Sequence, residues 1–421
     1  MLHKKAFGLL VGGAAVAIIG ACADNPEAGR SCPLLCPQQT ATLRDTTVDA
    51  IVSDTTVTGL PSIGNETFMM LSAHGDTVDT RAIIRFDTIQ QDYTKSGFDS
   101  TIVHIDTATL VVPIVTDSLH KLTAPITIEA YNVDTAATDT VASILGSLFR
   151  PDRFLGSHTF APESVTDTLR IPISTDTVLN RILNGTHLRV GLRLVSRVGA
   201  DLRLGTTNSS TPVTLRIKPS LDTSVTPLIV NPVSNTPVNQ TFLSGPLSDF
   251  TIVVKGVTAT PPTLIAVGGV PSRRTFFSFI VPSHIVDSTT VVRASLLLTQ
   301  VPNRRLLPRD SIFIFPVPVL AGPTITDISS ALQFIGTNGE FGLDSVSVAP
   351  ADSGVRSFEI VGLVRTWKGQ PTTVSPRTVA LRSGAEGFSP AEFDFFSTKA
   401  APAVRPRLRI TYALPVPFGL P

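Results

Sequence analysis

The segment Arg81–Asp87, RAIIRFD, decides the fold of this chain, because it holds an apolar run between polar breaks. Together with the residues before it, Thr67–Asp87 predicts two strands around a polar turn. Short alternating stretches follow at TATLVVPIV (107–115), ITIEAYNV (126–133), TDTLRIPI (166–173), HLRVGLRLV (187–195) and VTLRIKP (213–219). Short strands broken by Asp, Asn, Gly and Pro at this spacing predict an all-β sandwich.

The composition favours the same fold class and excludes one class of partner. Charged residues make up 16% of the chain and hydrophobic residues 42%, and there are 33 prolines. Low charge with many β-branched residues and prolines indicates strands joined by turns, and long helical periodicity is missing. The formal net charge of +1 gives no electrostatic case for nucleic acid as a partner.

The second half of the chain repeats the order of the first. RAIIRFD corresponds to RTFFSFI (274–280), TATLVV to RASLLL (293–298), DTVLNRILNG (176–185) to IVGLVRTWKG (360–369), and VTLRIKP to PRLRITY (406–412). The number of residues between each segment and its counterpart is similar for all four pairs, as a tandem duplication requires. We therefore expect two β-sandwich domains of one fold, at residues 45–220 and 221–421. The Pro/Thr/Asn-rich residues 218–241 are expected to be partly linker and partly the first strand of the second copy.

The motifs of the second half also suggest a family. Their order is TLIAVGG…RTFFSFIVP, the strand RASLLL, a short helix FEIVGLVRTWKG, and a closing VALRSGAE…FDFFSTKAAPAVRPRLRITY. This order resembles the DNRLRE-type domain, also classed as a family 96 carbohydrate-binding module. That family's pattern Arg-x-Leu-x-Phe-Asp is matched well by RAIIRFD, whereas RTFFSFI lacks the final Asp and Lys399 stands where Glu is usual. The resemblance implies jelly-roll sandwiches on a secreted or surface protein of bacteria, with carbohydrate as a ligand.

The N-terminus predicts an address in the cell envelope. A basic head, MLHKK, precedes an apolar run at residues 6–21, shorter than the ~20 residues of a bilayer-spanning helix. Such a pattern is typical of a secretory signal peptide at residues 1–21. IIGAC resembles the bacterial lipobox, which makes Cys22 the lipidated first residue; an ordinary cleaved signal with Cys22 as a core thiol is the alternative.

An acylated Cys22 would fix where the mature chain sits. Two or three acyl chains make a firm membrane anchor. Ala23 in place of Asp favours the outer membrane, at its periplasmic face or at the cell surface. The polar residues 22–44 are expected to form a flexible tether.

Cys32 and Cys36 lie in this tether as CPLLCP. In an oxidising compartment they form a small loop disulfide or remain two free thiols. A metal site would need further ligands, and no His or other Cys lies near them. We expect no metal site and no cofactor.

The sequence carries no catalytic motif. Its seven histidines form no H-E-x-x-H or H-x-H pair, and neither a G-x-S-x-G turn nor a Gly-rich phosphate loop is found. Carboxylate pairs can be assembled freely from the many Asp residues, so no such pair is informative. We therefore expect a protein that is not an enzyme.

Three residues are candidates for ligand binding. Tyr93 stands in QQDYTKSGFDS among polar residues and Gly, so its ring is expected to be exposed for stacking on a sugar, or to have no role. Arg273 and Arg274 stand beside an aromatic cluster. There they would hold an acidic polysaccharide or protect a hydrophobic strand from edge pairing. Trp367, on an apolar helical face, is expected in the core.

Three functions remain open on the sequence. The first is a lipid-anchored, non-catalytic cell-envelope protein whose sandwiches act as a structural or contact module. The second is a carbohydrate-binding lipoprotein that captures polysaccharide. The third is a polysaccharide lyase or hydrolase on a jelly-roll scaffold, which would need Tyr, His, Lys or carboxylates clustered in one cleft. The expected partners are the membrane, through the lipid anchor, and a polysaccharide or an envelope protein.

Overall fold

A computed structural model describes residues 42–415 with internal gaps. The residues outside the description are 1–41, 60–63, 65, 96, 116–121, 136–139, 236–246, 257, 320–342, 371–376, 388 and 416–421. The expected signal peptide, the lipidation of Cys22 and the disulfide of Cys32 and Cys36 lie outside the described residues. These three stay predictions.

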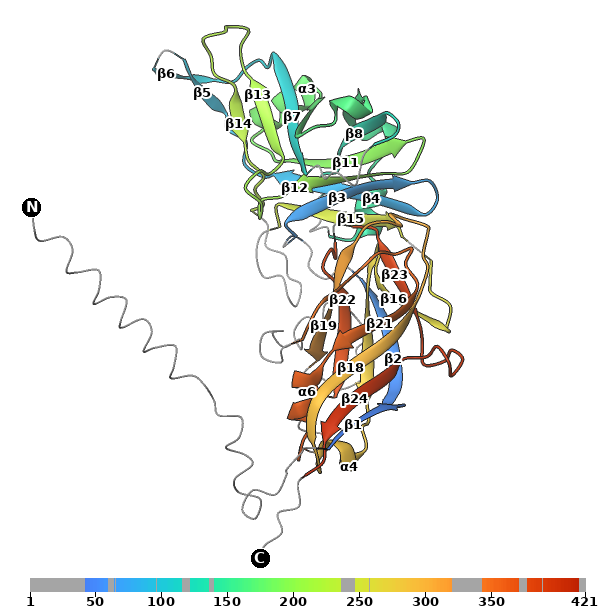
Figure 1. The fold of residues 1–421 in the computed structure, drawn as a ribbon. Coiled ribbons are helices and arrows are strands. Elements are labelled where there is room, and N and C mark those ends of the chain that lie inside the picture. Colours follow the sequence, from blue (N-terminus) through green and yellow to red (C-terminus); the bar gives the residue numbers. More distant parts are fainter. Residues whose placement is uncertain are drawn as a thin grey trace, which may run out of the picture.

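The described chain is all-β, as the sequence predicts, and forms two jelly-roll sandwiches stacked end to end (Figure 1). The first sandwich contains β3 (Phe68–His74), β4 (Val78–Phe86), β7 (Thr107–Val115), β8 (Ile126–Asn132), β9 (Phe154–Phe160), β10 (Thr168–Pro172), β11 (Leu188–Ser196), β12 (Ala200–Gly205), β13 (Thr214–Lys218), β14 (Leu228–Val230) and β15 (Asp249–Lys255). It also carries a separate hairpin of β5 (Asp92–Lys95) and β6 (Phe98–Thr101), helices α2 (Ala142–Gly146) and α3 (Thr175–Leu183), and two 3-10 turns, η1 (Pro151–Arg153) and η2 (Pro162–Ser164).

The second sandwich draws on both ends of the described chain. Its strands are β1 (Leu43–Val48), β2 (Ile51–Gly59), β16 (Leu264–Gly268), β17 (Ser272–Phe279), β18 (Thr290–Val301), β19 (Ile312–Val319), β20 (Val346–Val348), β21 (Gly354–Glu359), β22 (Thr378–Ser383), β23 (Glu392–Phe396) and β24 (Arg407–Ala413). Its helices are α4 (Ser283–Val286) and α6 (Val361–Thr366).

The two sandwiches have the same strand order. In the first, neighbouring strands follow β14-β13-β7-β12-β3-β4-β11-β8-β9, with β10 beside β7 and β15 beside β4. In the second they follow β1-β24-β18-β23-β16-β17-β22-β19-β20, with β21 beside β18 and β2 beside β17. The expected repeat is therefore confirmed strand by strand: β4 corresponds to β17, β7 to β18, β13 to β24, and helix α3 to α6.

The first two strands do not follow the expected domain boundary. The sequence predicts residues 45–220 as the first domain, yet β1 pairs with β24 and β2 pairs with β17, both in the second sandwich. Conversely β14 and β15, which follow residue 220, pair with β13 and β4 of the first sandwich. Each sandwich thus contains the first two strands of the other copy of the repeat. The second sandwich contains β1 and β2 of the first copy, and the first sandwich contains β14 and β15 of the second copy.

The first sandwich is consequently an insertion in the second. Its strands run without interruption from β3 to β15, and the strands of the second stand on both sides of this block. The chain crosses between the sandwiches twice, after β2 and after β15. The sequence cannot show this, because a strand of either copy has the same alternating pattern whichever sheet it joins.

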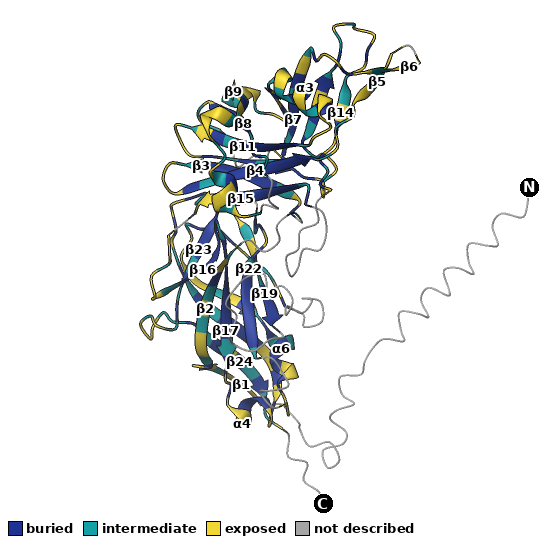
Figure 2. Ribbon diagram, turned by 180° about the vertical axis from the view of Figure 1, so that it is seen from behind, coloured by how far each residue is buried: buried dark blue, intermediate teal, exposed yellow. Residues whose placement is uncertain are grey.

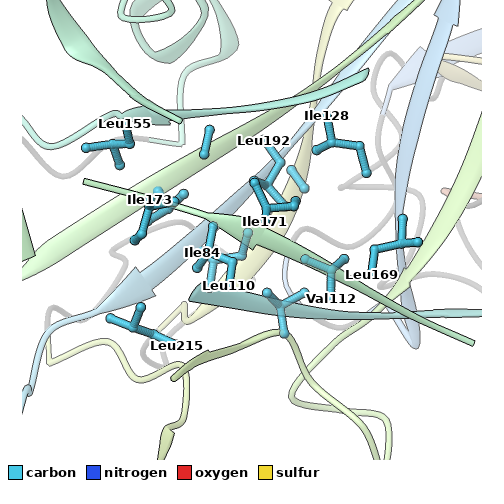
Figure 3. Packing of buried hydrophobic residues seen from close by; sticks show 14 of the residues in the cluster. Ile84, Leu110, Val112, Ile128, Leu155, Leu169, Ile171, Ile173, Leu192 and Leu215 are labelled. Atoms are coloured by element: carbon cyan, nitrogen blue, oxygen red, sulfur yellow. The ribbon is translucent and has the colours of Figure 1, made fainter. Parts of the chain in front are cut away.

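Each sandwich has its own apolar core (Figure 2). Figure 3 shows Ile84 of β4, Leu110 of β7 and Leu192 of β11 pointing into the first core. In the second core Trp367 is fully buried, with its ring 5.6 Å from that of Phe279. The expectation that Trp367 is a core residue is confirmed.

A small apolar cluster joins the two sandwiches. Met70 and Val78 from β3 and β4 and Val253 from β15 pack there with Val270 and Leu306 of the second sandwich. The cluster occupies the point where the chain crosses after β15. The two sandwiches are therefore held together by packing as well as by the chain.

We predict that residues 66–256 fold as an isolated fragment, whereas residues 45–220 do not. Residues 66–256 contain β3 to β15, whereas residues 45–220 lack β14 and β15. Phe250 and Ile252 of β15 are buried in one cluster with Ile83. Circular dichroism with thermal unfolding should show a cooperative transition for 66–256 alone. A cooperative transition for residues 45–220 at an equal or higher temperature would contradict the observed strand exchange.

Candidate functional site

The two copies differ at the connection that follows β4 in the first copy and β17 in the second. In the first copy residues 87–106 link β4 to β7 and build the β5–β6 hairpin. In the second copy the corresponding residues 280–289 form only the short helix α4. The sandwich fold does not need the hairpin, because the second copy closes its core without one. The hairpin is therefore the first place to look for a function.

A pocket of about 300 Å³ lies between the hairpin and the turn after β13. It is lined by Tyr93, Thr101, Val103, His104, Pro219, Ser220 and Leu221. Figure 1 places this hairpin at the end of the molecule farthest from β1 and α4. We call this part of the surface, formed by the hairpin, residues 103–104 and residues 219–222, the tip.

Tyr93 lines the pocket, but its ring is not fully free. It is half-buried and packs against the first core, while its neighbours Asp92 and Thr94 are exposed. The ring is therefore only partly exposed, whereas the sequence predicts an exposed one. The hydroxyls of Thr101 and Ser220 and the imidazole of His104 supply the polar groups around it.

An ion pair between exposed side chains connects the two walls of the pocket. Lys95 Nζ on the hairpin lies 3.1 Å from Asp222 Oδ2 on the turn. Hydrogen bonds from the backbone N–H and the hydroxyl of Ser224, with help from Lys95, lower the pKa of Asp222 to about 2. Asp222 is therefore ionised throughout the physiological range and keeps its partner.

The structure overturns both roles that were expected of Arg273 and Arg274. Both side chains are buried in β17, which pairs with β2 on one side and β22 on the other, so they guard no free edge. Arg274 makes a bidentate ion pair with Glu386, with Nε–Oε1 2.9 Å and Nη2–Oε2 2.6 Å. Neither guanidinium is accessible to an acidic polysaccharide.

Arg273 belongs to a buried polar cluster near the crossing between sandwiches. Its Nη1 lies 2.8 Å from Glu392 Oε2, and it also donates to Thr260 Oγ1 (2.8 Å) and to the carbonyl of Thr258 (2.5 Å). It thereby ties the segment that follows the crossing to β23. Removing one member of such a pair costs about 3–5 kcal/mol, because the other charge is left buried.

Two carboxylates of β23 meet in this cluster. Glu392 and Asp394 occupy alternate positions of the strand, and Asn303 Nδ2 lies 3.5 Å from Glu392 Oε1 and 3.0 Å from Asp394 Oδ2. Burial raises the pKa of Glu392 to about 7 against the opposing effect of Arg273, and burial also raises the pKa of Asp394. A buried carboxyl group with such a pKa titrates in the range of ordinary buffers.

We predict a pH-dependent stability that depends on Glu392. Because the pKa of Glu392 is raised in the native state, the protonated Glu392 side chain stabilises the fold fully below about pH 4.5. This contribution to the free energy of unfolding is lost as the pH rises through about 7. Relative to Glu392→Gln, which does not titrate, the wild type should lose up to about 3 kcal/mol between about pH 5 and pH 8. Urea unfolding followed by the fluorescence of Trp367, the single tryptophan, measures this. A difference that stays constant or grows with pH would contradict the prediction.

One group of side chains has the residue types of a hydrolase but not the arrangement. Ser72 Oγ donates to Asp201 Oδ1 at 2.5 Å, and His74 Nε2 lies 2.8 Å from Asp201 Oδ2. The aspartate thus stands between serine and histidine, whereas activation of a serine needs the histidine in the middle. This group gives Ser72 no general base.

Neither a metal centre nor a membrane-spanning helix is found in the described part of the chain. Within it, no three or more His, Cys, Asp or Glu side chains come together in a way that could hold a metal ion. No described helix has the length and apolar content to cross a membrane.

Sequence reasoning found Tyr93 but missed the residues around it. Phe98, Val103 and Leu221 are the most exposed large apolar residues of the described chain, and no motif marks them. A signal was present in the length difference between residues 87–106 and the corresponding residues 280–289 of the repeat.

Comparisons with known proteins do not supply a family. No protein-family model matches the chain, and no curated protein matches it. Among solved structures, the Macrobrachium rosenbergii nodavirus matches at 9% identity with a TM-score of 0.17, over 89% of this chain and 90% of that chain. The infectious bursal disease virus VP2 subviral particle matches at 10% identity with a TM-score of 0.13, over 89% of this chain and 76% of that chain. Likenesses with TM-scores this low carry no argument about function.

Proposed function

We propose that this chain is a lipid-anchored, non-catalytic cell-envelope protein that acts as a contact module, with the tip as its contact surface. The observation that carries the proposal is the placement of the chain's first strands. β1 lies at one end of the molecule, beside α4, and the β5–β6 hairpin lies at the opposite end (Figures 1 and 2). An anchor that precedes β1 would hold the tip away from the membrane.

The strand exchange suits such a spacer. β2 leads from the second sandwich directly into the first, and β15 returns the chain to the second. Because each crossing is flanked by strands paired into different sheets, the sandwiches are tied to one another by more than one linker. A module of this kind holds its far end at a more defined distance than two domains joined by a single flexible linker would.

The anchor is tested by lipid labelling of the full chain in a bacterial host. We predict that the wild type incorporates an alkyne-labelled fatty acid and fractionates with membranes, and that Cys22→Ser does neither. Cys32→Ser and Cys36→Ser are the matched controls and should keep the label. Equal labelling of the Cys22→Ser variant, or none in the wild type, would contradict the anchor.

A second candidate function is carbohydrate binding at the tip pocket. The observation in its favour is an aromatic ring, Tyr93, beside hydroxyl and imidazole groups in a pocket of about 300 Å³, which is large enough for a sugar unit. Stacking on an aromatic face combined with hydrogen bonds to hydroxyls is the usual chemistry of such sites.

We predict, for this second candidate, saturable binding of one polysaccharide by the mature chain on a glycan array. Tyr93→Ala should weaken that binding at least about tenfold, because the stacking face is removed. Val355→Ala, an exposed position of β21 in the other sandwich, serves as the control and should bind as the wild type does. Silence across neutral and acidic glycans would remove this candidate.

A further inference from the structure

The joint between the sandwiches, defined as the apolar cluster of Met70, Val78, Val253, Val270 and Leu306, contains two residues of the second sandwich. Val270 lies in the turn between β16 and β17, and Leu306 lies in the segment that follows β18. Neither residue belongs to a strand, so their positions depend on what holds these two connections. A third connection, the crossing after β15, joins the sandwiches through the chain itself.

The carboxyl group of Glu392, at the start of β23, holds two of these connections. Its Oε2 accepts a hydrogen bond of 2.8 Å from Nη1 of Arg273. The same guanidinium donates to Thr258 and Thr260, which lie in the crossing. The Oε1 atom of Glu392 lies 3.5 Å from Nδ2 of Asn303, in the segment that follows β18. Both the crossing and this segment are therefore bound to one carboxyl group.

The turn between β16 and β17 packs directly on the same carboxyl group. A Cβ at Gly269 would lie 2.8 Å from Glu392 Oε2, and the N–H of Gly269 donates to the carbonyl of Ala391 at 2.8 Å. The crossing lies close to this turn, because a Cβ at Gly256 would lie 2.6 Å from the carbonyl oxygen of Val270. All three connections on the second-sandwich side of the joint thus meet at Glu392.

Three charged groups face Glu392, whose side chain is buried. Arg273 of β17 and Arg305 of the segment after β18 are cations, and Asp394 of β23 is an anion. Burial raises the pKa of Glu392 to about 7, with Arg273 acting in the opposite direction. The Oδ1 atom of Asp394 is buried and accepts no hydrogen bond from any residue that the structure describes. The cluster therefore offers little hydration to a second negative charge.

We propose that Glu392 is a pH-dependent latch of the joint. When its carboxyl group is protonated, the turn and the segment after β18 close over it. When the group is ionised, its hydration requires that these two connections separate from β23, which withdraws Val270 and Leu306 from Met70 and Val78. The inference goes beyond the proposed function, since it concerns the joint and depends neither on the anchor nor on the tip.

The direction of the pH effect follows from the two states of the latch. In the open state the carboxyl group is in water and has its ordinary pKa of 4.5, whereas in the closed state its pKa is about 7. The open population is therefore constant below about pH 4.5, rises with pH up to about 7, and is constant again above that. Because each pKa unit corresponds to a factor of ten, the full rise is on the order of a hundredfold.

The test is amide hydrogen exchange of the full mature chain, measured by mass spectrometry between about pH 5 and pH 8 and corrected for intrinsic exchange rates. Opening exposes the N–H of Gly269 and that of Asn303, which donates to the carbonyl of Pro350 at 2.7 Å. Peptides 264–272 and 300–308 should lose protection on the order of a hundredfold across this range in the wild type. In Glu392→Gln, which cannot ionise, their protection should stay constant.

Two controls separate opening of the joint from other effects. Glu163→Gln removes an exposed glutamate in η2 of the first sandwich and should behave as the wild type does. The N–H of Ile360, which donates to the carbonyl of Ala294 at 2.8 Å in the second sandwich, reports unfolding of that sandwich.

Two results would overturn the inference. The first is exchange of the joint amides at the rate of Ile360 throughout the pH range, because the joint would then open only when the sandwich unfolds. This comparison is made within the wild type, so it stands even if Glu392→Gln does not fold. The second is a loss of protection with rising pH that is as large in Glu392→Gln as in the wild type.

Discussion

The pairing of β2 with β17, and of β15 with β4, is the interaction on which the rest of the structure depends. Both pairs carry an aspartate at the equivalent position, Asp54 opposite Phe277 of β17 and Asp249 opposite Ile84 of β4, and each aspartate binds the segment that follows β23 or β12. Asp54 of β2 accepts a hydrogen bond from the N–H of Thr398 at 2.5 Å, and Asp249 of β15 accepts one from the N–H of Thr207 at 2.7 Å. Because each strand comes from the other copy, these two pairs turn a tandem repeat into one interlocked unit.

Buried ion pairs near the crossing add specificity to this arrangement. Arg274 with Glu386, and Arg273 with Glu392, are satisfied only if β17, β23 and the loop before β23 are all in place. Such pairs contribute little net stability, since desolvation offsets attraction, but a misplaced strand would leave a charge buried alone. The same arginines look on the sequence like ligand-binding residues, because burial cannot be inferred from an Arg-Arg dipeptide.

The comparison between the two copies locates the candidate site. Two sandwiches of one fold have similar needs for packing, so a feature present in one copy alone is a candidate for a role beyond folding. The β5–β6 hairpin is such a feature, and it brings Tyr93 and Leu221 to one pocket. The hairpin lies at the end of the molecule opposite β1 (Figure 1).

The sequence by itself determined the fold class, the repeat and the core role of Trp367, because alternation of apolar residues and their spacing are local properties. It also suggested the envelope address through the residues before Cys22. Only the tertiary structure decided that β1 and β2 belong to the second sandwich, that Arg273 and Arg274 are internal, and that Tyr93 and Leu221 line one pocket. Those facts depend on which distant segments pair, and strand partners share one pattern, so the pattern cannot choose between them.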